Sequence, residues 1–286
     1  MNIIISFCLY LLIATSFSII YKSAKFFHFA HAVIIVLGAY FVFFFSNQTG
    51  LHLFSAILFS ALCVLIISLC FELYLYKPFK VLNVSSWKLL IVSLGAYIVL
   101  QNIVSMIWGD HVQSFRTWPV ETGNKFFGAY ITDVQIIIIA LSILLIVLTW
   151  LFLKKTKTGK EIHAISNNKA LSQIFGISVD KVTLISFLIG SVLAAIAGIL
   201  IASDSDMRPT MGFNWLLYGI IAMIIGGIGK IKHLIFGSML LATSQHLVAY
   251  YLSSKWMDAT AFIILIAFLA WKPLGFSGQK LKKTEI

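Results

Sequence analysis

The sequence predicts an all-α fold: a polytopic transmembrane helical bundle of about eight or nine membrane helices, built by the whole chain, 1–286, as one domain. Hydrophobic residues make up 60% of the chain and charged residues only 11%, against roughly 25% charged in soluble domains. Several apolar runs approach the roughly 20 residues that a helix needs to cross the hydrocarbon layer. The alternating ten-residue patterns of an outer-membrane barrel are absent, so we expect the spans to be helices.

The hydrophobic runs divide the chain into nine predicted passes. They cover residues 3–20, 32–46, 53–76, 89–108, 133–153, 182–202, 213–228, 234–253 and 257–271. The first run has no Lys or Arg before its apolar part and no clear cleavage site, which favours a retained helix over a signal peptide. The second pass is short, with only about fifteen residues between His31 and Phe45. If it re-enters instead of crossing, the first helix inverts and the amino terminus changes side.

The basic residues are divided unevenly between the two sides that these passes define. One side holds seventeen of them: Lys22, Lys25, Lys77, Lys80, Lys88, Lys154, Lys155, Lys157, Lys160, Lys169, Lys181, Lys230, Lys232, Lys272, Lys280, Lys282 and Lys283. The other side holds four: Arg116, Lys125, Arg208 and Lys255. The side richer in Lys and Arg faces the cytoplasm in membrane proteins. We therefore expect a multi-pass protein of the cell (inner or plasma) membrane, with the segment 154–181 in the cytoplasm.

Several classes of function are disfavoured by what the chain lacks. Its net charge of +11 is not gathered with aromatic residues on a soluble segment, which argues against nucleic acid as a partner. The longest pieces outside the membrane are about 109–132 and 154–181, too short for a nucleotide-hydrolysing domain. The pairs Gly159-Lys160 and Gly229-Lys230 lack the other residues of a phosphate-binding loop. If ATP drives this protein, another chain hydrolyses it, and we expect this chain to be no enzyme, with no catalytic residues.

Two polar features inside the predicted spans have alternative explanations. His28 and His31 are three residues apart beside the short second pass, but no further ligands accompany them. We therefore favour hydrogen bonding at a helix break, or polarity of the transport path, over a metal site. Glu72 is the one acid placed inside a span, and we expect it to form an ion pair with Lys77 at the cytoplasmic boundary. Ion-coupled carriers use charged residues inside the membrane, so their scarcity disfavours a secondary carrier.

The segment "GKEIHAISNNKALSQIFGI", residues 159–177, is a polar, helix-capable stretch at the centre of this apolar chain. Gly176 is predicted to end its helix, because glycine enters the left-handed conformation without strain. Ala164, Leu171, Ile174 and Phe175 share one side of a helical projection, while Ile162 and Ile165 lie elsewhere. A helix lying on lipid needs a cleaner apolar face. Docking into another protein and an ordinary solvated helix are the two explanations that the pattern leaves open.

The stretch "TKTGKEIHAISNNKALSQIFGI" resembles the cytoplasmic loop of the branched-chain amino acid permeases of ABC importers, the LivH type. The matching residues are Thr156, Gly159, Ala164, Ala170, Gly176 and Ile177. His163 stands where the family usually has arginine, and Glu161 replaces a small residue. The resemblance implies a coupling helix seated on an ATPase subunit. The residues that it assigns to coupling are Gly159, Lys160, Glu161, His163, Ala164, Asn167, Asn168, Ala170 and Gly176.

The resemblance to these permeases continues in order along almost the whole chain. It includes "YLLIATSFSIIYKSAKFFHFAHAVIIVLGAY", "SLGAYIVLQNIVSMIWG", "RPTMGFNWLLYGIIAMIIGGIGKIKHLIFGSMLLA" and "KPLGFSG". The chain departs from the family pattern at Ser16 and Lys22, which replace glycines, at His28, which replaces asparagine, and at Ala32. The residues that the resemblance suggests for the substrate path are Phe29, His31, Gly38, Gly95, Gln101, Asn102, Gly226, Gly227 and Gly229.

These path residues also have purely structural explanations. The glycines at 226–229 allow close helix approach and a sharp turn. Gln101 and Asn102 are amides inside a predicted span, where each needs a partner or water, and bonding between helices is the commoner reason for such residues.

The resemblance implies a complete importer around this chain. Its partners would be a second permease subunit, in a homo- or heterodimer, two cytoplasmic ABC ATPases and an extracytoplasmic substrate-binding protein. ATP and Mg²⁺ would be used by those ATPases, and we expect this chain to bind no cofactor. The binding protein would dock at the outer loops 109–132 and 203–212, and the substrate would be a branched-chain or related amino acid. A sugar or nucleoside permease of the same superfamily is the alternative.

Overall fold

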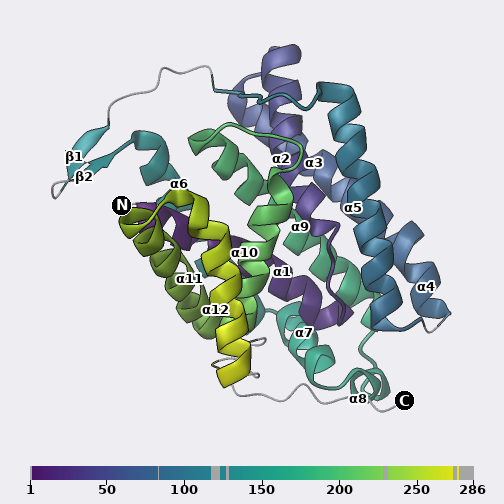
Figure 1. Ribbon diagram of the computed structural model, residues 1–286. Coiled ribbons are helices and arrows are strands. Elements are labelled where there is room, and N and C mark those ends of the chain that lie inside the picture. Colours follow the sequence, from purple (N-terminus) through teal and green to yellow (C-terminus); the bar gives the residue numbers. More distant parts are fainter. Residues whose placement is uncertain are drawn as a thin grey trace.

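The protein is a bundle of membrane-length helices with a small hairpin at one end (Figure 1). The computed structural model describes residues 2–82, 84–116, 123–126, 129–227, 231–272 and 276. The helices that cross the bundle or cap it are α1 Asn2–Ala24, α2 His31–Phe43, α3 Leu53–Cys70, α4 Lys77–Val81, α5 Ser86–Trp108, α6 Asp133–Lys155, α7 Lys157–Asn167, α8 Lys169–Ile174, α9 Val179–Asp204, α10 Met211–Gly226, α11 Ile231–Tyr251 and α12 Met257–Trp271. Two π-helical turns, η1 Phe44–Gln48 and η2 Phe71–Tyr76, extend α2 and α3, a short 3-10 turn η3 Ser254–Trp256 precedes α12, and strands β1 Asn124–Phe126 and β2 Ala129–Ile131 pair antiparallel.

Among the described residues, seven helices are long and apolar enough to cross a membrane, or eight if α10 and α11 form one bent span. The seven are Asn2–Ala24, His31–Gln48, Leu53–Val81, Ser86–Trp108, Asp133–Lys155, Val179–Asp204 and Ser254–Trp271. This arrangement confirms the predicted all-α, multi-pass class. The predicted passes 213–228 and 234–253 correspond to α10 and α11, which meet at a bend of 119°.

The sequence allowed the second pass to re-enter the membrane, but the sharpest bend in the bundle lies elsewhere. The second pass, 32–46, was the one short enough to re-enter, but the π-helical turn after Phe43 carries it to Gln48 and gives an 18-residue span. The sharp bend lies instead between α10 and α11. It begins at Gly227, whose φ of +88° is in the left-handed region that favours glycine.

Contacts between two loops show that both lie at the same end of the molecule. Gln113 and Met207 exchange backbone hydrogen bonds of 3.0 and 2.9 Å, which joins the loop after α5 to the loop after α9. Arg116 and Asp206 form an ion pair of 2.6 Å across the same two loops. In Figure 1 the β hairpin lies at the upper left, while α7 and α8 lie at the bottom. The two outer loops predicted to share a side therefore do so, opposite the lysine-rich segment 154–181.

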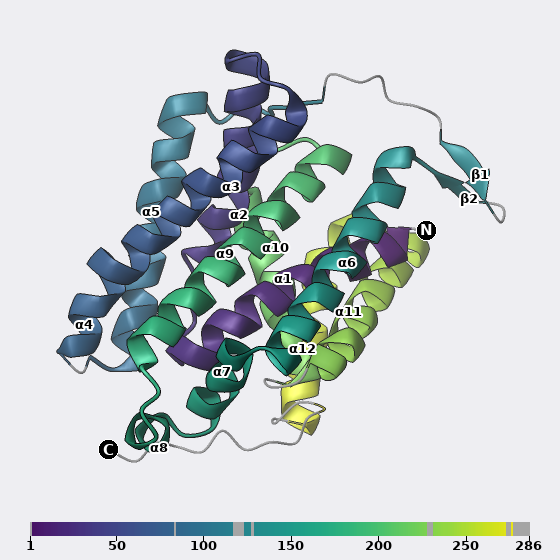
Figure 2. The ribbon, with the colours of Figure 1, turned by 180° about the vertical axis from the view of Figure 1, so that it is seen from behind.

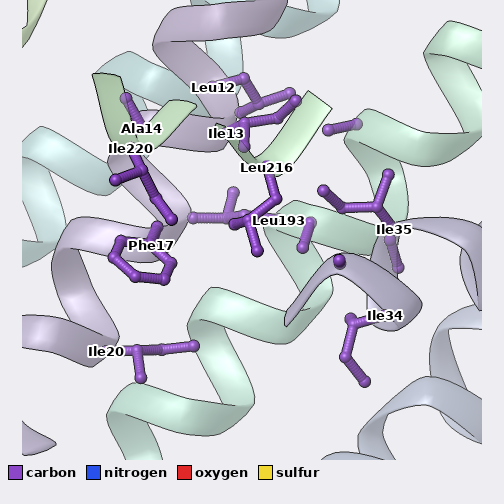
Figure 3. Packing of buried hydrophobic residues seen from close by; sticks show 14 of the residues in the cluster. Leu12, Ile13, Ala14, Phe17, Ile20, Ile34, Ile35, Leu193, Leu216 and Ile220 are labelled. Atoms are coloured by element: carbon purple, nitrogen blue, oxygen red, sulfur yellow. The ribbon is translucent and has the colours of Figure 1, made fainter. Parts of the chain in front are cut away.

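Four helices, α1, α2, α9 and α10, form the centre of the bundle. In the most apolar part of α1, 78% of residues are buried, with 67% in α9 and 61% in α2. The corresponding shares are 28% or less in α3, α5, α6 and α12, so these helices lie at the periphery with apolar side chains facing outward. Figure 3 shows Leu193 of α9 and Leu216 of α10 together in the core, with Phe17 of α1 on one side of them and Ile35 of α2 on the other.

Glycines bring α2 and α9 into backbone contact. A Cβ on Gly38 would overlap the Ala195 carbonyl of α9, and a Cβ on Gly198 would overlap the Ile35 carbonyl of α2. Because lipid tails give little hydrophobic drive for helix association, membrane helices rely on this close van der Waals packing of small residues. The two glycines make α2 and α9 a single packed unit at the centre of the protein.

Adding a side chain at this contact should destabilise the bundle. We expect Gly198→Val to cost about 1–3 kcal/mol, the usual range for overpacking a tight interior, and to lower the midpoint of thermal unfolding of the protein in detergent. Gly95→Val is the matched control, because a Cβ at Gly95 meets no atom within 4 Å. Equal midpoints for the two variants would show that α2 and α9 do not depend on this contact.

Candidate functional site

The polar segment predicted to be cytoplasmic folds as two short helices held by caps. The Thr156 hydroxyl donates to the Phe152 carbonyl at the end of α6 (2.8 Å) and accepts from the Gly159 amide at the start of α7 (3.0 Å). Asn168 is extended, with φ −153°, and its side-chain oxygen accepts from the Leu171 amide (3.0 Å) at the start of α8. One threonine thus turns the chain from a membrane helix into α7, and one asparagine turns it from α7 into α8.

The expectation of a continuous helix over 159–177 is wrong, because the chain breaks at Asn168. Asparagine side chains bond to nearby backbone groups and so favour helix caps over helix interiors. The predicted end of the segment is confirmed: Gly176 has φ +79°, and its amide donates to the Gln173 carbonyl (2.9 Å).

The two short helices turn their apolar residues in opposite directions. Ile162 and Ile165 of α7 are buried, and a Cβ on Gly159 would overlap the Phe152 carbonyl, so this face of α7 rests on the bundle. In contrast, Ile174 is 80% exposed and Phe175 76% exposed, and Leu171 is also exposed. An ordinary solvated helix would present polar groups here. An apolar cluster exposed at the lysine-rich end of the protein is typical of a surface that another protein covers.

The residues that the resemblance assigned to coupling fall into three groups. Lys160, His163, Asn167, Asn168, Ala170 and Gly176 are exposed, Glu161 and Ala164 are half-buried, and Gly159 is buried. Gly159 therefore positions α7 against α6 and is covered by the bundle. No structural observation here tests whether the exposed residues touch a partner, so their coupling role stays a prediction.

Lys25 links α7 to the end of α1. Its ammonium donates to the Ser166 carbonyl in the last turn of α7 (2.6 Å), while its own amide donates to the Tyr21 carbonyl at the end of α1 (3.0 Å). Lys25 has φ +59°, a left-handed conformation that few non-glycine residues adopt. A cation at a helix carboxyl end is favourable, because the exposed carbonyls there carry partial negative charge. Burial lowers the pKa of Lys25 below its ordinary value.

A buried polar cluster lies at the corner between α1 and α2, next to this link. The His28 Nδ1 is hydrogen-bonded to the Tyr76 hydroxyl (2.8 Å), and the His31 Nε2 to the Ser16 hydroxyl (2.9 Å). Both histidines are fully buried. The described residues contain no group of three metal-ligating side chains. Both histidine bonds join side chains of different segments, and the start of α2 has no side-chain cap bond, so these contacts tie neighbouring helices together. A contribution to the polarity of a transport path stays a prediction.

The ion pair at the end of α3 has a different partner from the one expected. Glu72 pairs with Lys80 (2.5 Å), not with Lys77. The reason is the π-helical turn Phe71–Tyr76, which has more residues per turn than an α-helix and brings Lys80 onto the side of Glu72.

The residues suggested for the substrate path do not form one cluster. His31 and Gly38 lie in the buried core on α2, and Gly226 packs against the His233 carbonyl at the turn into α11. Gly227 is the turn residue itself, and Gly229 lies outside the described residues.

The remaining path residues face outward or the neighbouring helices. Gly95 and Asn102 are exposed on α5, and Gln101 beside them is half-buried. Asn102 donates to the Ile98 carbonyl of its own helix (2.7 Å), so the bond between helices that we expected for it is not formed. Phe29 donates its amide to the Ser93 hydroxyl (3.0 Å).

An aromatic ladder joins the turn before α2 to α10 and α5, and no sequence pattern indicated it. The Phe29 ring stacks on Phe213 of α10, with 6.2 Å between the ring centroids, and Phe213 stacks on Tyr97 of α5 at 5.4 Å. These residues are far apart in the sequence, so no spacing pattern could connect them. The path roles of all these residues stay predictions.

Fold and site together define a class: a multi-pass helical membrane protein with an exposed apolar cluster on a polar segment at one end. A family model described as "Branched-chain amino acid transport system / permease component" matches residues 1–269, and the chain belongs to this family. The predicted family, fold class and membrane location are confirmed. As a permease component, this chain is a transport subunit.

Two of the similar proteins match this chain over nearly its full length, and a third matches about half of it. The high-affinity branched-chain amino acid transport system permease protein LivH of Escherichia coli (strain K12) is 28% identical over 284 residues, covering 94% of this chain and 91% of LivH. The corresponding permease protein BraD of Pseudomonas aeruginosa is 26% identical over 287 residues, covering 94% of this chain and 92% of BraD. The ribose import permease protein RbsC of Haemophilus influenzae is 32% identical over 155 residues, covering 51% of this chain and 48% of RbsC.

Removing the Lys25 link should loosen α7 without unfolding the bundle. We expect Lys25→Met to raise the hydrogen-exchange rate of the last amides of α7 by about fivefold or more, since a hydrogen bond from a charged group contributes about 1 kcal/mol or more. Lys181→Met, at an exposed position in the first turn of α9, is the control and should leave exchange in α7 unchanged. Equal exchange in the two variants would mean that Lys25 does not hold α7.

Proposed function

We propose that this chain is a permease subunit of an ATP-binding-cassette importer and that it moves branched-chain or related amino acids into the cell. The observation that carries the proposal is the exposed apolar cluster of Leu171, Ile174 and Phe175 on the segment predicted to be cytoplasmic, in a chain of the permease family. The relatives LivH and BraD are named for branched-chain amino acid transport, which supports this substrate class.

The mechanism is alternating access driven from outside the chain. ATP and Mg²⁺ bind to two partner ATPases, and closure of these subunits displaces α8 and α7. Lys25 then carries the displacement to the corner between α1 and α2, because its ammonium holds Ser166 of α7. Since α2 and α9 are in backbone contact through Gly38 and Gly198, the two helices move together. Rigid-body movement of packed helices is a common way to switch a path from one side to the other. No bond in the substrate is formed or broken.

The second permease subunit is proposed to cover the outward face of α5. Only 17% of the most apolar part of α5 is buried within this chain, yet Gly95 and the amide of Asn102 lie on its exposed side. An amide facing hydrocarbon is costly, whereas a second subunit offers it hydrogen-bond partners and closes a path between the two chains. The extracytoplasmic binding protein would dock on the loops joined by Arg116 and Asp206. Glu121, which we also expected there, lies outside the described residues.

A sugar permease is the second candidate, because the similarity to the ribose permease RbsC covers about half of this chain. Reconstitution into liposomes with the co-purified ATPase and binding protein distinguishes the two. We expect ATP-dependent uptake of radiolabelled leucine that unlabelled isoleucine inhibits and ribose does not. Inhibition by ribose alone would establish the sugar permease. Uptake by the isolated chain in an ion gradient, without an ATPase, would refute the importer in both forms.

A charge placed in the exposed cluster should separate ATP hydrolysis from transport. We expect Leu171→Asp combined with Ile174→Asp to reduce leucine uptake at least about tenfold, because two carboxylates in an apolar contact lose their hydration. ATP hydrolysis should then no longer respond to the loaded binding protein. Gln173→Asp adds a charge on the other side of the same exposed helix and should keep coupling. Unchanged coupling in the double variant, with the ATPase still bound, would show that α8 is not the contact.

A further inference from the structure

A pocket at the end of the bundle that is predicted to be cytoplasmic is lined by cationic side chains. Its volume is about 510 Å³, and it lies where α1 and α6 end and α7 and α11 begin (Figure 2). The polar side chains that line it are Lys22, Lys154, Lys160, Lys232 and His163. Trp150 also lines it, and the Lys154 ammonium lies 4.8 Å from the centre of the Trp150 ring. Not one Asp or Glu is among the described residues of this lining.

Lys22 is the most unusual member of the pocket. It comes from the last turn of α1, its side chain reaches the pocket, and only 3% of the residue is exposed. It has no hydrogen bond or ion pair with any residue that the structure describes. A buried ammonium normally has a partner, because loss of hydration costs several kcal/mol. The Lys22 side chain lines the pocket, so an anion bound there would supply the partner that no described residue provides.

The other side chains that line the pocket also favour an anion as its ligand. Lys154, Lys160 and Lys232 are exposed at the pocket, and each adds positive charge beside Lys22. Partial burial and the nearby Lys22 ammonium lower the pKa of His163 below its ordinary value, so the ring is neutral near pH 7 and can donate one hydrogen bond. The ligand that fits four ammonium groups and one imidazole is a phosphate.

The position of the pocket identifies the source of that phosphate. It lies at the ends of membrane-spanning helices, the depth of the lipid headgroups, and basic pockets between helices at the cytoplasmic side are typical binding sites for anionic lipids. Directly above it, α6 exposes Leu144, Val147, Leu148 and Leu151, and α11 exposes Ile235 and Phe236. These apolar surfaces can hold acyl chains while the headgroup occupies the pocket.

We propose that this pocket binds the phosphate headgroup of an anionic phospholipid, such as phosphatidylglycerol, with Lys22 as the central ligand. The bound lipid would join the end of α6, the start of α11 and α7, and so hold the coupling segment at the membrane surface. This site is separate from the exposed cluster of Leu171, Ile174 and Phe175, and it does not depend on the substrate.

The test measures which lipid the purified protein keeps. The chain is placed in nanodiscs of phosphatidylcholine with or without about 20 mol% phosphatidylglycerol, whose headgroup is anionic, and native mass spectrometry then counts the phospholipids retained. We expect the wild type to prefer phosphatidylglycerol by at least about tenfold, given the attraction of each lysine for anionic lipid. The triple variant Lys154→Gln, Lys160→Gln, Lys232→Gln should lose this preference.

The matched control is the triple variant Lys155→Gln, Lys157→Gln, Lys181→Gln. It removes the same charge from exposed positions that do not line the pocket, and it should keep the preference. Size-exclusion profiles show whether each variant is folded. Equal loss in both triple variants would mean general surface attraction, and equal retention in both would mean that the pocket is not the site.

Two further arms separate the other anions. Inorganic phosphate is titrated into phosphatidylcholine nanodiscs by calorimetry, and micromolar binding that the pocket variant abolishes would assign the pocket to a free phosphate instead of a lipid. Loss of the co-purified ATPase in the pocket variant, with lipid retention unchanged, would assign it to a partner carboxylate. Either result overturns the lipid proposal.

Discussion

The contact between α2 and α9 is the constraint on which the rest of the structure depends. In lipid, helices gain little from burying apolar groups, so two backbones must approach closely enough for dispersion and weak hydrogen bonds to hold them. Gly38 and Gly198 allow that approach from opposite sides of one interface. With the interface fixed, α1 and α10 complete the core, and the peripheral helices can expose apolar side chains to lipid or to other subunits. The corner that carries Lys25 is then held at a defined position above α7.

The general fold could be predicted from the sequence because its signal is composition and charge, which need no knowledge of contacts. Apolar runs located the spans, and the excess of lysines sorted the loops into two ends. Local backbone geometry was harder to predict. The π-helical turns at Phe44–Gln48 and Phe71–Tyr76 have no marker in the hydrophobic pattern; they extended the second span and changed the partner of Glu72. For the bend at Gly227, the sequence indicated only a cluster of glycines that permits a turn.

The sequence could predict where in the chain the candidate site lies, but not which of its side chains face outward or inward. The polar segment 159–177 stood out because it interrupts an apolar chain, and the motif around Gly159 and Gly176 pointed to the permease family. Neither observation could reveal which apolar residues face inward, since Ile162 and Phe175 are equally hydrophobic in a projection. The Lys25 link and the lysine-lined pocket depend on side chains more than a hundred residues apart. Such pairings are set by the folded bundle and leave no pattern in one sequence.

The break at Asn168 has a mechanical consequence. The inner helix, α7, rests on the bundle, while α8 carries the apolar cluster on a separate short helix. A displacement of α8 would reach α7 through Asn168 and α9 through residues 175–178. The joint at Asn168 is braced: the Ser172 hydroxyl donates to the Asn168 carbonyl (2.7 Å), and the Asn168 amide donates to the Ala164 carbonyl (3.0 Å). These hydrogen bonds limit how far α8 can tilt without moving α7 as well.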